Sequence, residues 1–501
     1  MKIKDNLVKI LVPVLAILVA FAAGGIIMLC MGKNPFQAYG FLFSGAFGST
    51  RKIAQTLVIA CPLIFTGLAA SFAYKCGVFN LGGEGQFIMG AVTSIFVSAK
   101  LGDAGVFGLL LSLVAGTAAG GLWGAIPGIL KITRGLNEII VSIMLNYVAT
   151  LFMGYVYTTL LRDGSVPQTV AVADSMKIAN ISKGFPVHWG IVAAILLAAA
   201  LYYFIFNTSK GFKLRAVGMN STAAFFNGFP VNQYILFSFI VSGAIAGLGG
   251  SIELHGKQLR LMSGFGAGFG FDGVAIALIA QLNPIGTAVV AFIFAVLRKG
   301  ASTLQTGMQV PTSVVDIIQA LVIIFAVAGT ALLRLPAVKQ FIINHSQKRR
   351  YGADVIIFHC KFPRGAAAFS GAYGDAHPSG GAGGNLFRAR GHGKYRSGWI
   401  MSIGALVGFL VGYRTGSPWA GILAGAAAGI LVNMIYAFCT ITLCAEQTVY
   451  GMAINIFAPA LASFIYRLSF SDTSTLIQGV SMEAFPIPVL SQIPVLGNIP
   501  F

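Results

Sequence analysis

Charged residues are scarce in this chain. Only 9% of its 501 residues are Asp, Glu, Lys or Arg, whereas 56% are hydrophobic, and the mean hydropathy is +0.83. Too little polar surface exists to cover a soluble domain, so the composition excludes one. The six cysteines form no CxxC pair, and no GxxxxGK[ST] motif supplies the phosphate cradle of a P-loop ATPase. We therefore expect no ATP hydrolysis by the chain itself, no other enzymatic activity, no resident metal and no cofactor.

Long apolar runs make up most of the sequence. A helix that crosses a bilayer needs about 20 mostly apolar residues. Ten candidate spans lie near 8–30, 54–74, 80–99, 106–130, 137–160, 189–206, 234–254, 264–282, 284–297 and 313–333. The first begins after three lysines and has no small-residue cleavage site behind it, which favours a retained helix over a signal peptide. We predict an all-α, polytopic membrane protein in the lipid bilayer.

Basic residues in the short loops indicate the orientation. If ten spans are threaded in order, one group of basic residues lies on the same side as the N-terminus, which we predict to be cytoplasmic. This group comprises Lys75, Lys131, Arg134, Lys210, Lys213, Arg215, Arg334 and Lys339. Lys33, Arg51 and Lys52 would lie outside and weaken the assignment, and the loop 161–187 would face the exterior. Basic residues of membrane proteins gather in cytoplasmic loops because they set the orientation of membrane insertion. This accounts for the formal charge of +19, so no nucleic-acid partner is expected.

The composition changes abruptly between Lys348 and Gly398. Nine of the 33 basic residues and three of the six histidines lie here, and membrane patterning is lost. The segment is interpreted as a disordered linker, as a metal site, or as a stretch translated out of frame. The candidate metal ligands are His345, His359, Cys360, His377 and His392.

The frame hypothesis can be examined in the sequence itself. Reading the codons for Leu386 to Trp399 one base later permits FSERAGMVNIGLDG. Continued into the IMSIGA of residues 400–405, this sequence lies without gaps over Phe72–Ala91. A second similarity relates NEIIVSIMLN (137–146) to EQTVYGMAIN (446–455), and each segment lies roughly 50 positions after its Gly-Asn-Gly motif. The tail therefore looks like part of a second copy of the first region.

Polar side chains interrupt the apolar runs, most densely in GVFNLGGEGQFIMGA (77–91). A charge at the bilayer centre costs about 2.5–3.5 kcal/mol on insertion scales, so such residues often mark a substrate pathway. The candidates are Asn80, Glu84, Gln86, Asn137, Glu138, Asn146 and Asp272, with Glu253, Gln281 and Gln319 as further polar groups. The alternative is a structural role in hydrogen bonding between helices, which the neighbouring glycines favour for Asn80 and Glu84. Asn137 and Asn146 would lie about 180° apart on one helix, so a shared cavity is not expected.

Three blocks resemble the permease subunits of bacterial ABC importers in the branched-chain amino acid, ribose and nucleoside group, most closely the nucleoside or simple-sugar permeases. They are residues 77–91, RGLNEIIVSIMLNYVA (134–149) and GFKLRAVGMNSTAAFFNGFPV (211–231). The likeness covers about 1–335 and, with the second subunit's pattern, 399–501. It implies ten helices per subunit, a pore between paired permeases and a location in the bacterial plasma (inner) membrane. The implied partners are an ABC ATPase subunit, a second homologous permease subunit and an extracellular substrate-binding lipoprotein.

On this resemblance we interpret residues 1–347 as a complete permease. Residues 348–398 are then an out-of-frame or linker segment that is expected to be disordered. Residues 399–501 are a truncated fragment of a second permease with about three helices, which ends before a coupling loop of its own. We do not expect this tail to work as a permease.

The resemblance also implies a role for the basic loop 207–233. Its candidate ATPase-coupling residues are Gly211, Arg215, Gly218, Asn220, Ala223, Ala224 and Gly228. Small alanines let a short helix approach a partner closely, and Asn220 with Ser221 is suited to capping that helix. An ordinary basic loop is the alternative.

The function implied is inward movement of nucleosides or related sugars by alternating access, driven by a separate ATPase. Branched-chain amino acids or other small polar solutes are the alternative substrates. A secondary transporter would need an inverted repeat and an ion-coupling carboxylate, whereas the repeat in this sequence is a parallel repeat of the whole subunit. A channel would conduct without ATP.

Overall fold

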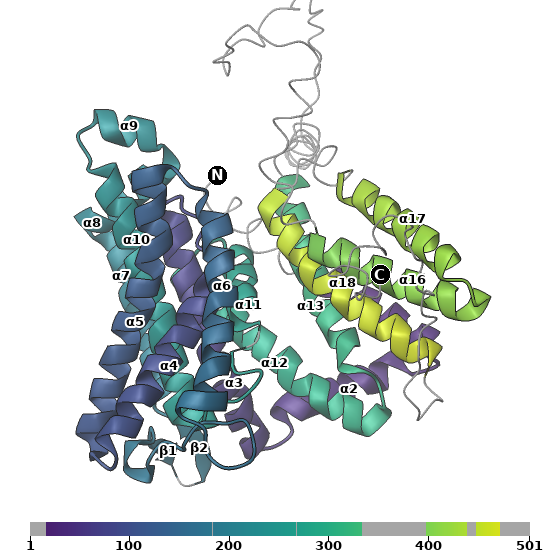
Figure 1. Ribbon diagram of the computed structural model, residues 1–501, viewed down its shortest axis with the longest axis horizontal. Coiled ribbons are helices and arrows are strands. Elements are labelled where there is room, and N and C mark those ends of the chain that lie inside the picture. Colours follow the sequence, from purple (N-terminus) through teal and green to yellow (C-terminus); the bar gives the residue numbers. More distant parts are fainter. Residues whose placement is uncertain (1–16, 183, 267, 333–396, 438–446, 471–501) are drawn as a thin grey trace, which may run out of the picture. The chain divides into compact units, whose positions relative to one another are not determined.

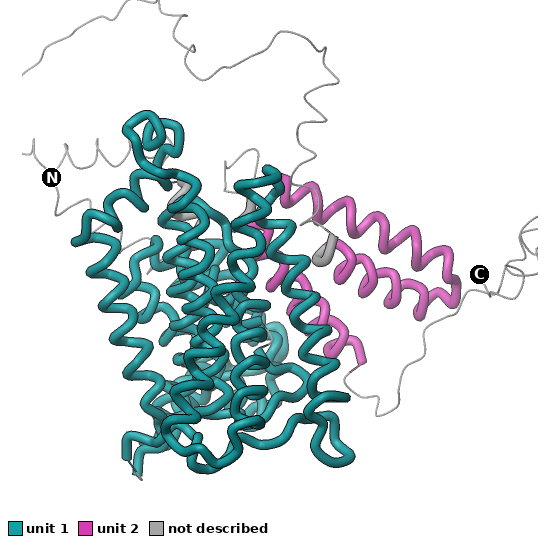
Figure 2. The backbone as a smooth tube through the Cα atoms, turned by 60° about the vertical axis from the view of Figure 1, so that its left-hand side comes forward, with its two compact units in different colours: residues 1–327 teal, residues 328–501 magenta. Residues whose placement is uncertain are grey.

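The computed structural model describes residues 17–182, 184–266, 268–332, 397–437 and 447–470 (Figure 1). The chain forms two compact units, Met1–Val327 and Ala328–Phe501, which are coloured separately in Figure 2. The predicted linker 348–398 and its candidate metal ligands lie almost entirely outside the described residues, as do Arg334, Lys339 and the first three lysines. Within the described part, no three His, Cys, Asp or Glu residues are grouped to hold a metal ion.

The first unit is built from helices. A helix Ile17–Cys30 comes first. It is followed by α2 (Pro35–Phe47), α3 (Thr50–Lys75), α4 (Gly83–Leu101), α5 (Gly105–Arg134), α6 (Glu138–Tyr155), α7 (Gly190–Asn207), α8 (Ser209–Met219), α9 (Ser221–Phe226), α10 (Val231–Glu253), α11 (Phe269–Ile279), α12 (Pro284–Met308) and α13 (Thr312–Leu332). Two short π-helices, η1 (Val156–Leu160) and η3 (Leu254–Gln258), and a 3₁₀ turn, η2 (Asp174–Met176), extend this series. The strands β1 (Asn180–Ser182) and β2 (Phe185–His188) form one antiparallel hairpin.

The predicted fold class is confirmed. In the part that the structure describes, seven helices are long and apolar enough to span a membrane, or eight if a bent pair counts as one span. One of the seven, α17 (Pro418–Ala437), belongs to the second unit. The protein is therefore all-α apart from the small hairpin, and polytopic.

Four of the ten predicted spans, 8–30, 80–99, 264–282 and 313–333, are not among the seven described helices that are long and apolar enough, and two of these four differ in form. The segment 264–282 contains only the 11-residue α11, which rises about 16 Å and covers about half of a bilayer core. The helix Ile17–Cys30 ends in a turn and bends by 118° into α2. Asn34 caps α2 and Pro35 occupies its first turn, so the local sequence begins a new helix here. The hydropathy pattern shows neither the half-length helix nor the bend.

The core of the first unit surrounds α3, whose most apolar window is 83% buried. Glycines let α4, α5 and α10 approach one another at backbone distance. A Cβ built on Gly90 would lie 2.3 Å from the carbonyl oxygen of Gly247, and one on Gly120 would lie 2.4 Å from that of Gly243. Any side chain at these positions would push the helices apart, as in the small-residue interfaces of membrane helices.

The two ends of the first unit differ in structure. The short helices α8 and α9 lie at one end, and the hairpin with the loop 161–189 lies at the other (Figure 1). Lys75, at the end of α3, and Arg215, on α8, both place their charge over the ring of Phe206, at 5.6 and 5.3 Å. Part of the predicted basic group therefore gathers at one end.

The second unit contains α16 (Ser397–Thr415), α17 and α18 (Gln447–Ser469). Helices α16 and α17 form an antiparallel pair joined by a short turn around Gly416, and α16 also contacts α18. Gly421 and Gly425 of α17 approach the carbonyl oxygens of Gly408 and Gly404 at 2.6 and 2.7 Å, measured from a built Cβ.

Candidate functional site

A buried network of amides holds the break between α3 and α4. The Nδ2 atom of Asn80 donates to Oε1 of Gln86 at 3.0 Å and to Oγ of Ser242 at 2.9 Å. Its Oδ1 atom accepts from the backbone N–H of Gly82 at 3.0 Å and from Nε2 of Gln86 at 3.1 Å. Both amide side chains are at most 2% exposed. Because both side-chain amides form their hydrogen bonds within the protein, the network fixes the path of the chain between the two helices.

Asn146, on α6, forms hydrogen bonds with the backbone on the α4 side of this break. Its Oδ1 atom accepts from the backbone N–H of Gly85 at 2.8 Å, and its Nδ2 atom donates to the carbonyl of Leu81 at 2.9 Å. Gly85 is required here, because a Cβ would lie 2.8 Å from that Oδ1 atom. We call Asn80, Gln86, Asn146 and Ser242 the amide clamp.

Glu84 connects the amide clamp to α11. One carboxylate oxygen, Oε1, accepts from the backbone N–H of Gly268 at 3.3 Å, and among the described residues Oε2 is buried without a hydrogen-bond partner. Gly270 lies against the backbone of Glu84, where a Cβ would be 2.3 Å from its nitrogen. The first turns of α4 and α11 therefore meet, and the positive ends of two helices surround one carboxylate.

Asp272, in the first turn of α11, forms a buried ion pair with Arg298 of α12. The guanidinium of Arg298 also lies over the ring of Phe269, 5.1 Å from its centroid. Asp316 of α13 is exposed, and Arg298 and Asp272 are the charges that act on its carboxylate. We call Glu84, Asp272, Arg298 and Asp316 the charged cluster. It contains three carboxylates and one cation.

The remaining two pathway candidates lie elsewhere. Asn137 is exposed and caps α6 by accepting from the backbone N–H of Ile139 at 3.0 Å. Glu138 forms an ion pair with Lys131 of α5. The sequence placed both within the membrane, but they mark the start of α6, at its connection to the end of α5. The structure thus brings five of the seven candidates together through Glu84 and leaves Asn137 and Glu138 apart.

Sequence reasoning did not single out Arg298 or Ser242. Arg298 interrupts the apolar pattern of α12, which is a usable signal for an intramembrane charge. Ser242 carries no such signal, because a serine in a membrane helix is ordinary and its partner is 162 residues away.

The predicted coupling loop folds into α8 and α9. Thr208 caps α8 by accepting from the N–H of Gly211 at 3.0 Å, and Asn220 caps α9 by accepting from the N–H of Ala223 at 2.9 Å. Two glycines seat α8 against the core. A Cβ at Gly211 would lie 2.0 Å from the carbonyl oxygen of Phe204, and one at Gly218 would lie 2.2 Å from that of Lys75. Helix α8 is therefore in direct contact with the end of α3.

The outer surface of α8 and α9 is apolar. Met219, Phe225 and Phe226 are 88, 67 and 81% exposed. A hollow of about 520 Å³ lies on each side of α9, and Phe229 lines both. Large exposed apolar groups at a polar end of a protein are typical of a binding surface. We call Met219, Phe225 and Phe226 the apolar knob.

Other predicted coupling residues support this surface from within. Ala224 is buried at 4% exposure, Ala223 is exposed, and Gly228 ends α9 with a left-handed φ of 74°. Arg215 is only half-buried and packs on Phe206 rather than projecting outward.

A buried histidine lies at the opposite end. His188 closes β2 and is 1% exposed, and neither ring nitrogen has a partner in the described part of the chain. Burial, aided by the charge of Lys257, lowers the pKa of His188 to about 4. The imidazole is therefore neutral at physiological pH.

Comparisons with known proteins identify the family of the chain. Residues 52–327 match the family described as "Branched-chain amino acid transport system / permease component". The chain belongs to this permease family. The resemblance expected from the sequence is confirmed, and the chain is a multi-pass transporter permease of the plasma membrane.

Several curated relatives match most of their own length. The chain is 36% identical over 333 residues to the guanosine ABC transporter permease protein NupP of Bacillus subtilis, covering 65% of this chain and 95% of that protein. It is 32% identical to the nucleoside ABC transporter permease protein NupB of Lactococcus lactis, covering 68% and 97%. It is 34% identical to the glucose ABC transporter permease protein TsgB13 of Haloferax volcanii, covering 63% and 87%. No solved structure matches the chain significantly.

Proposed function

We propose that the first unit is the permease subunit of an ABC importer that carries nucleosides into the cell by alternating access. The observation that carries this proposal is the 36% identity to a guanosine permease over 95% of that protein's length. The charged cluster supports it, because its carboxylates accept hydrogen bonds from the hydroxyl and N–H groups of a neutral nucleoside.

The substrate route passes the charged cluster rather than the amide clamp. Among the described residues the amides of the clamp are hydrogen-bonded to protein, whereas Glu84 keeps one oxygen unpaired and Asp316 is exposed. Between these two groups of described residues, the cluster is the one with hydrogen-bonding capacity left for a passing solute. The clamp instead holds the α3–α4 break in shape.

The apolar knob docks on a separate ATPase subunit. Its motion reaches the centre through α8, because Gly218 lies against Lys75 and Gly77 without an intervening side chain. Gly77 begins the loop that leads to Asn80. In this proposal the end that carries α8 and α9 is cytoplasmic, a second homologous permease completes the pore, and an extracellular lipoprotein delivers the substrate.

The second unit is a fragment of such a second permease, and residues 348–398 are out of frame. The close approach of α16 and α17 at glycines supports this origin, because α4 and α5 approach in the same way. Sequencing the DNA around Trp399 tests the proposal. An intact frame, together with peptides from 365–398 in a digest of the protein, would overturn it and make the segment a true linker.

Uptake by proteoliposomes tests the transport proposal. The vesicles contain this chain, its ATPase and the second permease, with the binding lipoprotein outside, and receive radiolabelled guanosine, glucose or leucine. We expect guanosine to accumulate only when ATP is present. Accumulation of leucine alone would contradict the nucleoside assignment, and uptake without ATP would indicate a channel or a secondary transporter.

A matched pair of carboxylates tests the route. Glu84 and Glu138 both lie in the first turn of a helix. Glu84→Gln keeps an acceptor for Gly268 but removes the charge, and we expect guanosine uptake to fall about tenfold. Glu138→Gln should leave uptake nearly unchanged. An equal loss of guanosine uptake in both variants would show that the charged cluster does not lie on the substrate route.

Two further measurements test the coupling end. Phe226→Ala should weaken retention of the ATPase on the permease about tenfold, whereas Leu196→Ala, which removes an exposed apolar group of α7, should not. A cysteine placed at position 226 in a cysteine-free background should react with an impermeant maleimide only in inside-out vesicles. Labelling in right-side-out vesicles would mean that the end carrying α8 and α9 faces the exterior, opposite to the proposed orientation.

Sugar transport is the second candidate function. It is favoured by the 34% identity to a glucose permease and by the same hydroxyl-accepting carboxylates. Competition separates the two substrates, because an excess of unlabelled glucose should leave guanosine uptake intact if nucleosides are the substrate.

A further inference from the structure

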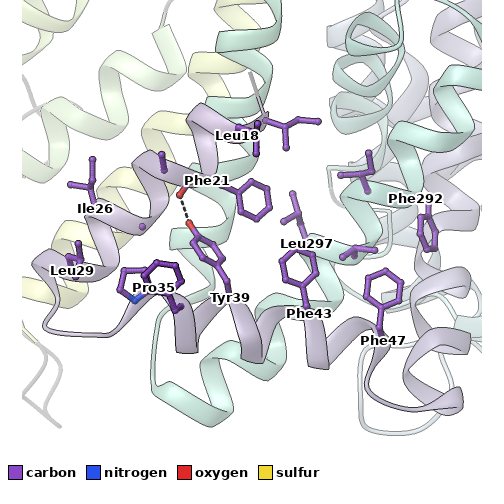
Figure 3. Close-up of a pocket in the computed structure, with 16 residues that line it drawn as sticks. Leu18, Phe21, Ile26, Leu29, Pro35, Tyr39, Phe43, Phe47, Phe292 and Leu297 are labelled. Carbon is purple, nitrogen blue, oxygen red and sulfur yellow. Dashed lines mark hydrogen bonds between the residues drawn. The ribbon is translucent and has the colours of Figure 1, made fainter. Parts of the chain in front are cut away.

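An apolar groove opens beside α2. The helix Ile17–Cys30 and α2 form two of its sides through their 118° bend, and α12 forms the third (Figure 3). The cavity holds about 740 Å³. This lies within the range of about 300–1,000 Å³ that is typical of cavities enclosing small molecules.

The side chains that line the groove are almost entirely hydrocarbon. Phe21, Phe43 and Phe47 line it from the bent pair, and Phe292 and Leu297 line it from α12 (Figure 3). Tyr39 carries the only polar side chain of the lining, and its hydroxyl already donates to the carbonyl of Phe21. An occupant with an unpaired polar group would lose its hydrogen bonds to water without replacement.

Positive charge brackets this groove. Lys33 lies two residues before Pro35, and Arg51 lies four residues after Phe47, and both Pro35 and Phe47 line the cavity. Neither cation forms an ion pair with another described residue. The sequence contains no Asp or Glu between residues 17 and 83. The surroundings therefore attract an anion at the ends of α2.

We propose that the groove binds an acyl chain of an anionic phospholipid, whose phosphate is held at the membrane surface by a cation at one end of α2. A phospholipid joins an uncharged chain to a negative headgroup, and these are the two properties that the groove and its ends require. Juxtamembrane Lys and Arg residues attract anionic lipids by the same electrostatics.

Native mass spectrometry of the full chain tests this binding. The protein is released from detergent in the presence of equal amounts of phosphatidylglycerol or phosphatidylcholine. We expect phosphatidylglycerol to be retained about fivefold more than the zwitterionic lipid. The double variant Lys33→Gln/Arg51→Gln should lose this preference, whereas Lys100→Gln, which neutralises an exposed lysine of α4, should keep it.

A second pair of variants tests the groove itself. Ala22 lines the cavity, and Val19 is exposed on the same helix but outside the lining. Ala22→Trp should reduce retention of both lipids about fivefold, and Val19→Trp should not, with size-exclusion profiles used to confirm that both variants fold. Equal retention of the two lipids, or equal effects within either pair of variants, would overturn the proposal. A species of twice the mass that is lost in Ala22→Trp would also overturn it, because it would show a second copy in the groove.

Discussion

The pair α4–α5 in the first unit and the pair α16–α17 in the second use the same contact. A Cβ on Gly116 of α5 would lie 2.6 Å from the carbonyl oxygen of Gly90, and one on Gly425 of α17 would lie 2.7 Å from that of Gly404. The overlay of residues 400–405 on the end of Phe72–Ala91 places Gly404 on Gly90. The packing of two adjacent helices is therefore present in both regions.

The difference lies in what surrounds each pair. In the first unit α10 packs on both helices, and Asn146 of α6 ties down the start of α4. In the second unit the aligned Asn455 of α18 is exposed. A hairpin of helices thus requires only its own glycines, whereas the amide clamp and the charged cluster require α6, α10, α11 and α12. This comparison locates the difference between the two units in their long-range contacts.

The largest effect is expected from filling the shared glycine contact. Gly116→Leu places a side chain against the backbone of α4 and against Ser251 Oγ, which a built Cβ already approaches at 1.9 Å. Overpacking costs about 1–3 kcal/mol or more when the backbone cannot move. We expect little folded protein in the membrane by size-exclusion chromatography and no guanosine uptake. Gly425→Leu should leave uptake intact, and a loss there would make the tail a working part.

The next effect is a pH dependence found in the first unit, since the described residues of the second contain no histidine. The pKa of His188 is about 4 in the folded protein because of burial, below the usual unfolded value of about 6.5. Between these values the unfolded state binds more protons, so stability should fall as pH decreases from about 6.5 to 4, by up to about 3 kcal/mol. Thermal unfolding should show this slope. His188→Gln should make this slope clearly smaller, and an unchanged slope would refute the assignment.

A smaller effect separates the two aligned asparagines. Asn146→Leu leaves the N–H of Gly85 and the carbonyl of Leu81 buried without partners, at a cost of about 1–3 kcal/mol. Asn455→Leu removes an exposed side chain and should change little. Unfolding midpoints of the two variants measure the contrast. Similar shifts would mean that the clamp contributes no more than an exposed amide.

The smallest effect concerns two helix caps. Asn220 caps α9, and Ser417 accepts from the N–H of Ala420 at the start of α17, at 3.5 Å. Replacing either by Ala costs its helix about 1 kcal/mol. Only Asn220→Ala should lower substrate-stimulated ATP hydrolysis by the assembled transporter, by about fivefold. If Ser417→Ala lowers it equally, the second unit contributes to coupling.

Much of the helical framework follows from the sequence alone. The apolar runs at 54–74 and 106–130 correspond to α3 and α5, and the residue type of Asn220 anticipates its cap. Hydropathy does not distinguish the half-length α11 from a full span, because the glycine-rich run before it is also weakly apolar. It also placed Asn137 in the membrane, since a polar cap directly precedes an apolar run.

The site was harder to predict than the framework. The amides of Asn80 and Gln86 stand six residues apart, so their proximity is local. The pairing of Asp272 with Arg298 and of Asn146 with Gly85 depends on how distant helices pack. No periodicity within a single helix contains that information.

The contact of Gly218 with Lys75 and Gly77 has a reciprocal consequence. In the proposed mechanism, a push on α9 reaches the loop before Asn80, because no side chain separates Gly218 from Lys75 and Gly77. If an ATPase docks on α9 as proposed and changes the affinity of the charged cluster for substrate, thermodynamic linkage requires bound substrate to change the affinity for the ATPase by the same factor. Binding of the substrate would thus change how tightly the ATPase subunit is held before ATP is hydrolysed.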